Sequence, residues 1–232
     1  MTLLTTQPCG LLLVWTNIPQ HLDDDFNEWY NREHMPERIL GLDGFVRGRR
    51  FVAYEGGPRY LALYDTRSIT AFSGERYLAL KRDYDAVSLR FVPNFKDTLK
   101  FAAEVTAQAG TAEGGFIAVM PIARAAGKAQ ALRAWIANTL LPEVAALRGV
   151  LSAWYAERND GAVAMAKQDH LRTADRILDG MLVVEATSND ALDAAMPLLS
   201  WDRLHVQGAA PDVPVARLRN IFSLHLPPPV HN

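Results

Sequence analysis

The sequence predicts an α+β protein of two tandem ferredoxin-like lobes, each a βαββαβ unit, whose sheets pair into one α/β barrel within the chain. Three observations lead to this fold class. A segment of the first half recurs in the second half, and both halves show the same order of apolar patterns. A ferredoxin-like sheet also carries helices on one face only, so its bare face needs a cover, which a second sheet can provide.

The repeat lies in the first predicted helix of each half, where the segment 26–45 has a degenerate copy at 132–150. Four residues recur 106 positions later, or 105 for the glycine: Trp29 as Trp135, Pro36 as Pro142, Glu37 as Glu143 and Gly44 as Gly149. The repeat divides the chain into a first lobe at 1–108 and a second, degenerate lobe at 115–232. Small and polar residues at 107–114 predict the linker between them.

The elements of the first lobe follow from periodicity and from helix signals. The apolar run 10–17 fits a central strand covered on both faces. Three aspartates at 23–25 favour a helix start, and the helix reaches about His34 before Pro36 ends or kinks it. Alternation and turn residues then predict strands at 44–54, 60–64 and 99–105, with a helix at 68–82.

The second lobe repeats this order. We expect strands at 116–120, 150–156, 181–185 and 218–226, with helices at 128–147 and 189–199. The departure is the connection 157–179, which is polar, basic and far longer than the turn at 55–58. Such connections inside compact domains are either functional or disordered, and the sequence does not decide between the two.

Composition limits the partners and the compartment. A net charge of −2 with 22% charged residues gives no basic surface for phosphate backbones, so we do not expect nucleic acid as a partner. The lone cysteine, Cys9, cannot form an intrachain disulfide, which suits a reducing compartment. The apolar run 11–15 is too short to cross a bilayer and follows no basic segment, so we expect a cytoplasmic protein with no membrane partner.

The motif Trp29-Tyr-Asn-Arg-Glu-His-Met-Pro-Glu-Arg38, followed by Gly44-Phe45, resembles the W-x-x-x-E-H-x-P helix and Gly-Phe strand entry of the dimeric α/β-barrel superfamily, in particular of its EthD-like members. The resemblance implies a small-molecule pocket in each lobe. It also implies self-association as a homodimer, unless the intrachain pairing already satisfies the sheet. It does not fix a chemistry, because the superfamily includes cofactor-free monooxygenases, lactone isomerases, dehydrochlorinases, haem enzymes and proteins of no known activity.

The first predicted helix carries the candidate catalytic residues. On a helical wheel Phe26, Trp29, Tyr30 and Glu33 share one face, with His34 at its edge. A carboxyl group among aromatic rings has a raised pKa, and a histidine titrates near neutral pH, so Glu33 and His34 can form an acid/base pair. The alternative is structural: Glu33 bonds a backbone amide near Pro36, and His34 caps the helix end.

The second lobe serves as an internal control for this helix. The positions that match Glu33 and His34 are Thr139 and Leu140, so the fold does not need the two polar residues twice. Trp29 and Pro36 recur in both copies and are better explained by packing and chain direction. We therefore expect the first lobe to be the active one.

Two arginines in the second strand are candidates for substrate binding. Alternation places Phe45, Arg47, Arg49 and Phe51 on one face of the strand. If that face lines the barrel interior, Arg47 and Arg49 could hold a carboxylate, enolate or phenolate. If the strand extends past its neighbours, they are solvated, which is the reading that the sequence slightly favours.

A haem site is the remaining alternative for the chemistry. His170 in the long connection could be a proximal ligand, and Arg172 or Arg176 could meet the propionates. A lone histidine in a polar loop is more often a surface residue. The sequence shows no phosphate-binding glycine loop, no nucleophile elbow and no metal-ligand spacing, so we expect no metal and no nucleotide.

The sequence therefore predicts an enzyme that binds a small aromatic or unsaturated carbonyl compound in the first lobe and moves protons without a cofactor. Isomerisation, elimination and cofactor-free oxygenation all fit this description. His34 would be the base or acid, Glu33 its partner, Tyr30 and Arg47 or Arg49 the oxyanion stabilisers, and Trp29 and Phe26 the walls. The alternative from another class is a non-catalytic ligand-binding or stress-related protein.

Overall fold

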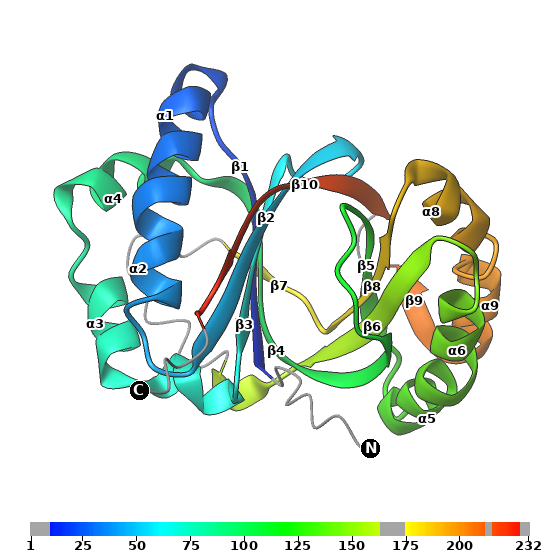
Figure 1. Ribbon diagram of the computed structural model, residues 1–232. Helices are drawn as coiled ribbons and strands as arrows, with labels where there is room; N and C mark the ends of the chain where they lie inside the picture. Colours follow the sequence, from blue (N-terminus) through cyan, green and yellow to red (C-terminus); the bar gives the residue numbers. More distant parts are fainter. Residues whose placement is uncertain (1–9, 163–174, 212–214, 228–232) are drawn as a thin grey trace, which may run out of the picture.

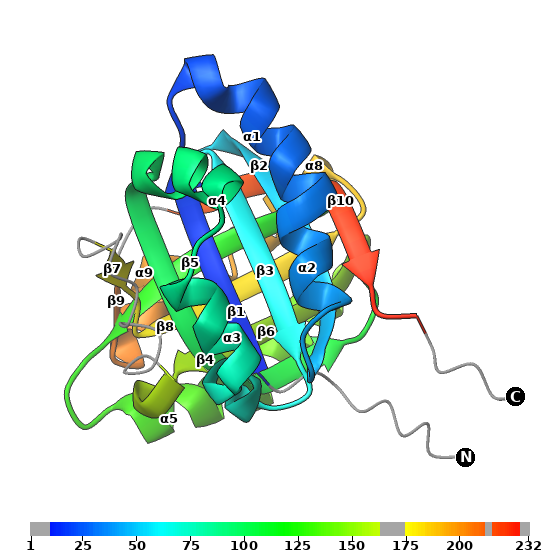
Figure 2. The ribbon, with the colours of Figure 1, turned by 90° about the vertical axis from the view of Figure 1, so that its left-hand side faces the viewer.

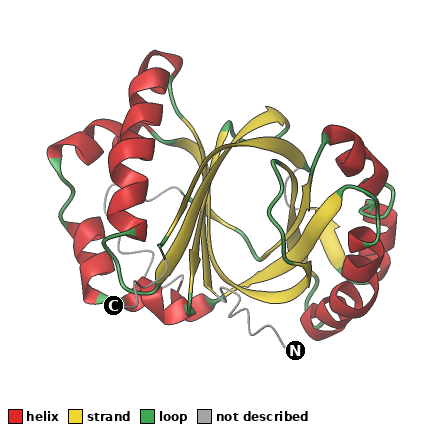
Figure 3. Cartoon of the chain, viewed as in Figure 1, coloured by secondary structure: helices red, strands yellow, loops and turns green. Residues whose placement is uncertain are grey.

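The computed structural model describes residues 10–162, 175–211 and 215–227. Eight antiparallel strands form a closed barrel in the order β1, β3, β2, β10, β5, β8, β6, β4 and back to β1. Helices cover the outer face of the barrel on two opposite sides (Figures 1 and 3). The predicted fold class, two ferredoxin-like units that pair their sheets within one chain, is confirmed.

Lobe one, the first ferredoxin-like unit, places its helices over the outer face of its own strands (Figure 2). Its elements are β1 (Gly10–Asn17), η1 (Gln20–Leu22), α1 (Asp23–Trp29), the π-helix η2 (Tyr30–His34), α2 (Met35–Ile39), β2 (Phe45–Glu55), β3 (Tyr60–Thr66), η3 (Ile69–Ser73), α3 (Glu75–Arg82), α4 (Ala86–Phe91), η4 (Val92–Asn94) and β4 (Lys96–Gly110). The single helix predicted at 68–82 is interrupted, because the backbone of Gly74 is extended between η3 and α3. The helix α4 was not predicted from the sequence.

Lobe two, the second unit, repeats the order with additions. Its elements are β5 (Phe116–Arg124), α5 (Ala129–Trp135), the π-helix η5 (Ile136–Leu140), α6 (Leu141–Ala145), β6 (Val150–Arg158), β7 (Arg176–Ile177), β8 (Gly180–Ala186), α8 (Asn189–Ala195), α9 (Trp201–Val206), β9 (Ala209–Pro211) and β10 (Ala216–His225). The short strands β7 and β9, which pair with β4 and β5, and the helix α9 were not predicted.

Two long strands join the lobes. β4 pairs with β1 through its first half and with β6 of lobe two through its second half. β10 likewise pairs with both β5 and β2. The linker predicted at 107–114 is therefore too long, since its first four residues, 107–110, continue β4. Each lobe thus contributes one strand that pairs with a strand of the other lobe. These two pairings close the barrel within one chain.

Three apolar clusters fill the molecule. One lies between the helices and sheet of lobe one, one occupies the same place in lobe two, and the third fills the barrel interior with residues such as Leu13, Phe51, Phe101 and Val183. The interior of the barrel is thus packed with side chains. None of the helices in the described part of the chain has the length and apolar character that crossing a bilayer requires.

Candidate functional site

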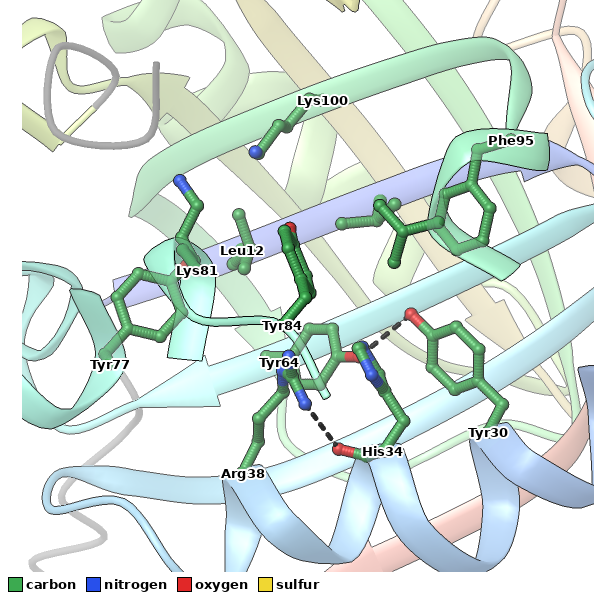
Figure 4. A pocket seen from close by; sticks show the side chains of 12 residues that line it. Leu12, Tyr30, His34, Arg38, Tyr64, Tyr77, Lys81, Tyr84, Phe95 and Lys100 are labelled. Atoms are coloured by element: carbon green, nitrogen blue, oxygen red, sulfur yellow. Dashed lines mark hydrogen bonds between the residues drawn. The ribbon is translucent and has the colours of Figure 1, made fainter. Parts of the chain in front are cut away.

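A small cavity lies in lobe one, between the outer face of the sheet and the covering helices (Figure 4). Its volume is about 40 Å³. Helix η2–α2, the strands β1, β3 and β4, and the segment 77–95 contribute its walls. The described residues that line it are Leu12, Val14, Tyr30, His34, Arg38, Tyr64, Tyr77, Lys81, Tyr84, Val92, Phe95 and Lys100. Two predicted catalytic residues, Tyr30 and His34, therefore meet at one cavity.

A π-helical turn sets which side chains of the helix reach this cavity. Pro36 has no N–H to bond the carbonyl of Arg32, and its ring would clash with that carbonyl in a regular α-helix. The turn widens to a π-helix, η2, which accommodates an extra residue. Tyr30, His34 and Arg38, four residues apart, then line the cavity together.

The same turn moves Glu33 away from the aromatic face. Residues three apart no longer align across a π-helical turn, and Glu33 is exposed. The prediction that Glu33 lies among the aromatic side chains is wrong in its geometry, because the helical wheel assumed a regular α-helix. A partnership between Glu33 and His34 finds no support in this arrangement.

Aromatic rings surround His34 on the helix side, as the sequence predicts. The imidazole lies with its centroid 4.4 Å from that of Trp29 and 4.6 Å from that of Tyr30. Phe26 packs edge-on against Tyr30 at 5.2 Å, one layer behind the cavity. Trp29 and Phe26 thus back the site as walls. Trp29 also stacks on Phe91, at 4.9 Å, which secures the helix against α4.

The hydroxyl groups of two buried tyrosines are linked at the cavity wall. Tyr64, on β3, donates a hydrogen bond of 2.9 Å to the Tyr30 hydroxyl. Complete burial, together with the neighbouring Tyr30, raises the pKa of Tyr64 well above its ordinary value, so Tyr64 remains a neutral donor. The hydrogen of Tyr30 itself is then available to another acceptor, such as a ligand in the cavity.

Arg50 is a buried residue of this site that the sequence analysis did not single out. Its guanidinium lies 4.3 Å from the centroid of the Tyr30 ring and is only 1% exposed. It donates to the side-chain oxygens of Asn31, at 2.6 Å, and Asn27, at 2.8 Å. Burial lowers the pKa of Arg50, although the nearby tyrosines, led by Tyr30, oppose this effect. A positive charge is thus held behind the Tyr30 ring by neutral groups.

A β-bulge near the start of β2 changes the face on which Phe45 lies. The pairing of β2 with β3 skips Val46, so the side chains on either side of it switch faces. Phe45 belongs to the helix-side cluster, whereas Arg49 and Phe51 face the barrel interior. The predicted single face for all four residues, 45, 47, 49 and 51, is therefore wrong at Phe45.

Arg47 and Arg49 bind carboxylates of the protein and do not line the lobe-one cavity. Arg49 is 1% exposed and pairs with Glu185 of lobe two at 2.7 Å. Arg47 pairs with Asp65 at 2.6 Å and Glu113 at 2.7 Å. The reading that these arginines are solvated is wrong. A role for them in substrate binding stays a prediction that this geometry does not favour.

Arg38 is the second buried cation that sequence reasoning missed. Only 7% of it is exposed, and its Nη1 donates to the backbone oxygen of His34, at 3.0 Å, and to Glu37, at 2.9 Å. Its spacing of four residues from His34 was the available signal. Residues four apart share one face of a regular α-helix, so an ordinary helical wheel already places both on one stripe.

The equivalent positions of lobe two are almost entirely aliphatic. Its π-helix η5 lies 106 residues after η2, and β6 carries a bulge at the same point as β2. Aligning the two π-helices, and the β2–β3 pairing with the β6–β8 pairing, gives the equivalent residues. Tyr30 corresponds to Ile136, His34 to Leu140, Arg38 to Val144, Tyr64 to Val184 and Arg50 to Tyr155. All five lobe-two residues are buried. The fold is therefore compatible with an apolar version of the whole cluster.

The haem alternative cannot be placed on the described residues. His170 and Arg172, like Cys9, lie outside them. Arg176 is exposed at the start of β7, where it pairs with Leu99 of β4, and it is not among the described residues that line the cavity. Within the described ranges, no three His, Cys, Asp or Glu side chains gather as a metal site requires.

Comparison with family models and with curated proteins finds no match to the sequence. Solved structures do match over nearly the whole chain. A proposed monooxygenase of Fusobacterium nucleatum is 9% identical, with 94% of each chain covered and a TM-score of 0.61. A proposed monooxygenase of Lactobacillus acidophilus is 10% identical, with 94% of this chain and 96% of that chain covered and a TM-score of 0.58.

An anthrone oxidase-like protein is 12% identical, with 93% of this chain and 92% of that chain covered and a TM-score of 0.60. At these identities the likeness concerns the fold alone. The narrower resemblance to EthD-like proteins stays a prediction. The chain has the closed, ferredoxin-like α/β barrel that these solved structures share.

Proposed function

We propose that lobe one is the active half of an enzyme that transfers protons on a small aromatic or unsaturated carbonyl compound without a cofactor. The observation that carries this proposal is the polar cluster of Tyr30, His34, Arg38 and Tyr64, present in one copy of the fold and aliphatic in the other. Buried polar groups cost stability, and the second copy shows that the fold does without them. A function in lobe one accounts for their presence.

His34 is the group that would take and return the proton. It is the only histidine among the described residues that line the cavity, and it is half-buried against Trp29 and Tyr30. An imidazole is the side chain best matched to proton transfer near neutral pH. Removing a proton next to a carbonyl leaves a pair of electrons that moves onto the carbonyl oxygen, which becomes an enolate.

Tyr30 is the group that would stabilise this enolate oxygen. Because Tyr64 donates to the Tyr30 oxygen, Tyr30 can donate its own hydrogen to the ligand, and the chained hydrogen bonds strengthen each other. Arg50 behind the Tyr30 ring adds a positive charge close to the developing negative one. Glu33 has no part in this scheme, because it is exposed.

Removal of a proton is the first step that isomerisation, elimination and cofactor-free oxygenation have in common. The similar structures include proposed monooxygenases and an anthrone oxidase-like protein, which is in keeping with the oxygenation branch. Those names belong to proteins of about 10% identity, so they do not select the branch for this chain. A homodimer stays a prediction, since the barrel is already closed within one chain.

The proposal can be tested without knowing the final product. A panel of small aryl ketones and unsaturated carbonyl compounds is incubated with the protein in D₂O, and the exchange of acidic C–H hydrogens is followed by NMR. General-base catalysis contributes about 10² to 10⁴ in rate, so His34→Gln should slow any enzyme-dependent exchange by about 100-fold or more. Activity that survives this substitution would show that His34 is not the base.

A matched histidine in lobe two provides the control. His205 is exposed and lies beside Trp201, with ring centroids 6.1 Å apart, so it has a tryptophan neighbour as His34 has. His205→Gln should leave the exchange rate unchanged. If the protein binds members of the panel but never exchanges their hydrogens, the non-catalytic ligand-binding alternative is the correct one.

A further inference from the structure

The side chain of Arg38 has hydrogen-bonding capacity that the protein does not use. A guanidinium carries five N–H groups. Two of them, both on Nη1, bond the His34 carbonyl and the Glu37 carboxylate. The other three, on Nε and Nη2, make no hydrogen bond to the described residues, although the residue is more than nine-tenths buried and lines the cavity.

The charge of Arg38 is only partly balanced. Its one acidic partner, Glu37, is 41% exposed on the solvent side, and exposed ion pairs contribute little. Among the described residues that line the cavity there is no aspartate or glutamate. Figure 4 shows Arg38 and His34 rising from the same side of the helix toward Tyr64. The guanidinium therefore presents a positive, donor-rich surface to the cavity.

The size of the cavity fits the head group of a ligand. One water-sized site occupies about 10 to 15 Å³, so about 40 Å³ holds roughly three heavy atoms, which is the size of a carboxylate. A cavity known to bind benzene measures about 150 Å³, so an aromatic ring does not fit inside one of about 40 Å³. Tyr84 and Phe95 line the cavity and are half-buried, unlike the fully buried strand residues Leu12 and Tyr64. The remainder of a ligand would extend toward these two rings.

We propose that the ligand of lobe one is an organic acid, whose carboxylate binds the free N–H groups of Arg38 and whose aromatic or unsaturated part lies toward Tyr84 and Phe95. The carbon next to the carboxylate then lies beside His34, one helical turn from Arg38. This inference rests on the proposed function only in that both place a ligand in the same cavity. It names a substrate class, the aryl-substituted or unsaturated acids.

The test compares two probes that have the same shape and differ in charge. Phenylacetate and phenylacetamide are titrated into the full chain at pH 7, and their affinities are measured by calorimetry. Charge-assisted bonds to a guanidinium are about twice as strong as neutral ones, so the acid should bind at least about tenfold more tightly than the amide. Equal affinity for the two probes, or no binding of either, overturns the proposal.

Two variants assign the preference to Arg38. Arg38→Met should abolish the preference for the acid, and Arg38→Lys, which keeps the charge and loses the planar fork, should retain part of it. The matched control is Arg203→Met in lobe two, because Arg203 also bonds one carboxylate, that of Glu143, and one backbone carbonyl, that of Leu198. A preference that persists in Arg38→Met, or that disappears in Arg203→Met, contradicts the proposal. Binding is measured without turnover, so its outcome is independent of the hydrogen-exchange test of His34.

Discussion

The hydroxyl of Tyr64 donates to the hydroxyl of Tyr30 across the helix–sheet boundary of lobe one, at 2.9 Å. One tyrosine comes from β3 and the other from the π-helical turn η2, 34 residues earlier in the chain. The bond therefore forms only when the helix packs in this position on the sheet. It also orients the hydroxyl hydrogen of Tyr30, which we propose is donated to the enolate oxygen.

Tyr64→Phe should lower the free energy of unfolding by about 1 kcal/mol, because the buried Tyr30 oxygen loses its donor. It should also slow the hydrogen exchange of a substrate. Urea denaturation and the NMR exchange assay measure the two effects. The control is Tyr155→Phe: the Tyr155 hydroxyl is buried and makes no hydrogen bond within the described chain, so its removal should be neutral or stabilising. Equal losses in both variants would contradict the role given to the Tyr64 donor.

Arg50→Met should slow the hydrogen exchange of a substrate and leave the stability of the protein nearly unchanged. The substitution removes a buried charge that has no carboxylate within ion-pair distance among the described residues, and an apolar side chain of similar length can fill its place. We expect the free energy of unfolding to change by less than about 1 kcal/mol, while substrate hydrogen exchange slows by about tenfold. A loss of about 3 kcal/mol or more in urea denaturation would instead assign Arg50 a structural role.

Glu185→Gln should destabilise the protein by about 3 to 5 kcal/mol at pH 7, because it leaves Arg49 buried without a counter-charge. Burial of Glu185 acts to raise its pKa, but the charge of Arg49 and the hydrogen bonds from Arg49, Gly114 and Trp154 outweigh it, so the pKa is lowered from 4.5. Glu185 then contributes stability above pH 4.5 that is lost as the pH falls through its lowered pKa.

The difference in stability between wild type and Glu185→Gln should accordingly shrink as the pH falls from 7 toward 3. Urea denaturation at a series of pH values measures it. The surface pair of Arg32 and Glu28, both largely exposed, provides the control, and Glu28→Gln should change stability by less than about 1 kcal/mol. A pH-independent difference for Glu185→Gln would show that the carboxylate is not the group that titrates.

The architecture could be predicted from the sequence because both copies keep the residues that pack the first helix and set the direction of the chain after it. Trp29 and Pro36 recur as Trp135 and Pro142, and in both copies the proline follows a π-helical turn. The strands carry apolar periodicity that extends over several residues, so the βαββαβ order is visible twice. Short elements such as α4 and β9 have no such period and were missed.

The site could be predicted only in part, because two one-residue insertions change which side chains face inward. The π-turn sends Glu33 outward, away from the stripe of Tyr30, His34 and Arg38. The bulge at Val46 puts Phe45 on the helix side of the sheet, the side on which Arg50 lies beneath Tyr30. Periodicity assumes regular elements, so it assigns residues at such an insertion to the wrong face, as it does for Glu33 and Phe45.

The continuous strand β4 has a consequence for how such a barrel can evolve. A barrel made from two identical chains must carry every ionisable residue in both halves, since one sequence specifies both. In this chain one covalent strand crosses from lobe to lobe, so each half can change on its own. Lobe two has diverged to an aliphatic version of the Tyr30, His34, Arg38 and Tyr64 cluster, and lobe one keeps these polar groups without having to duplicate them.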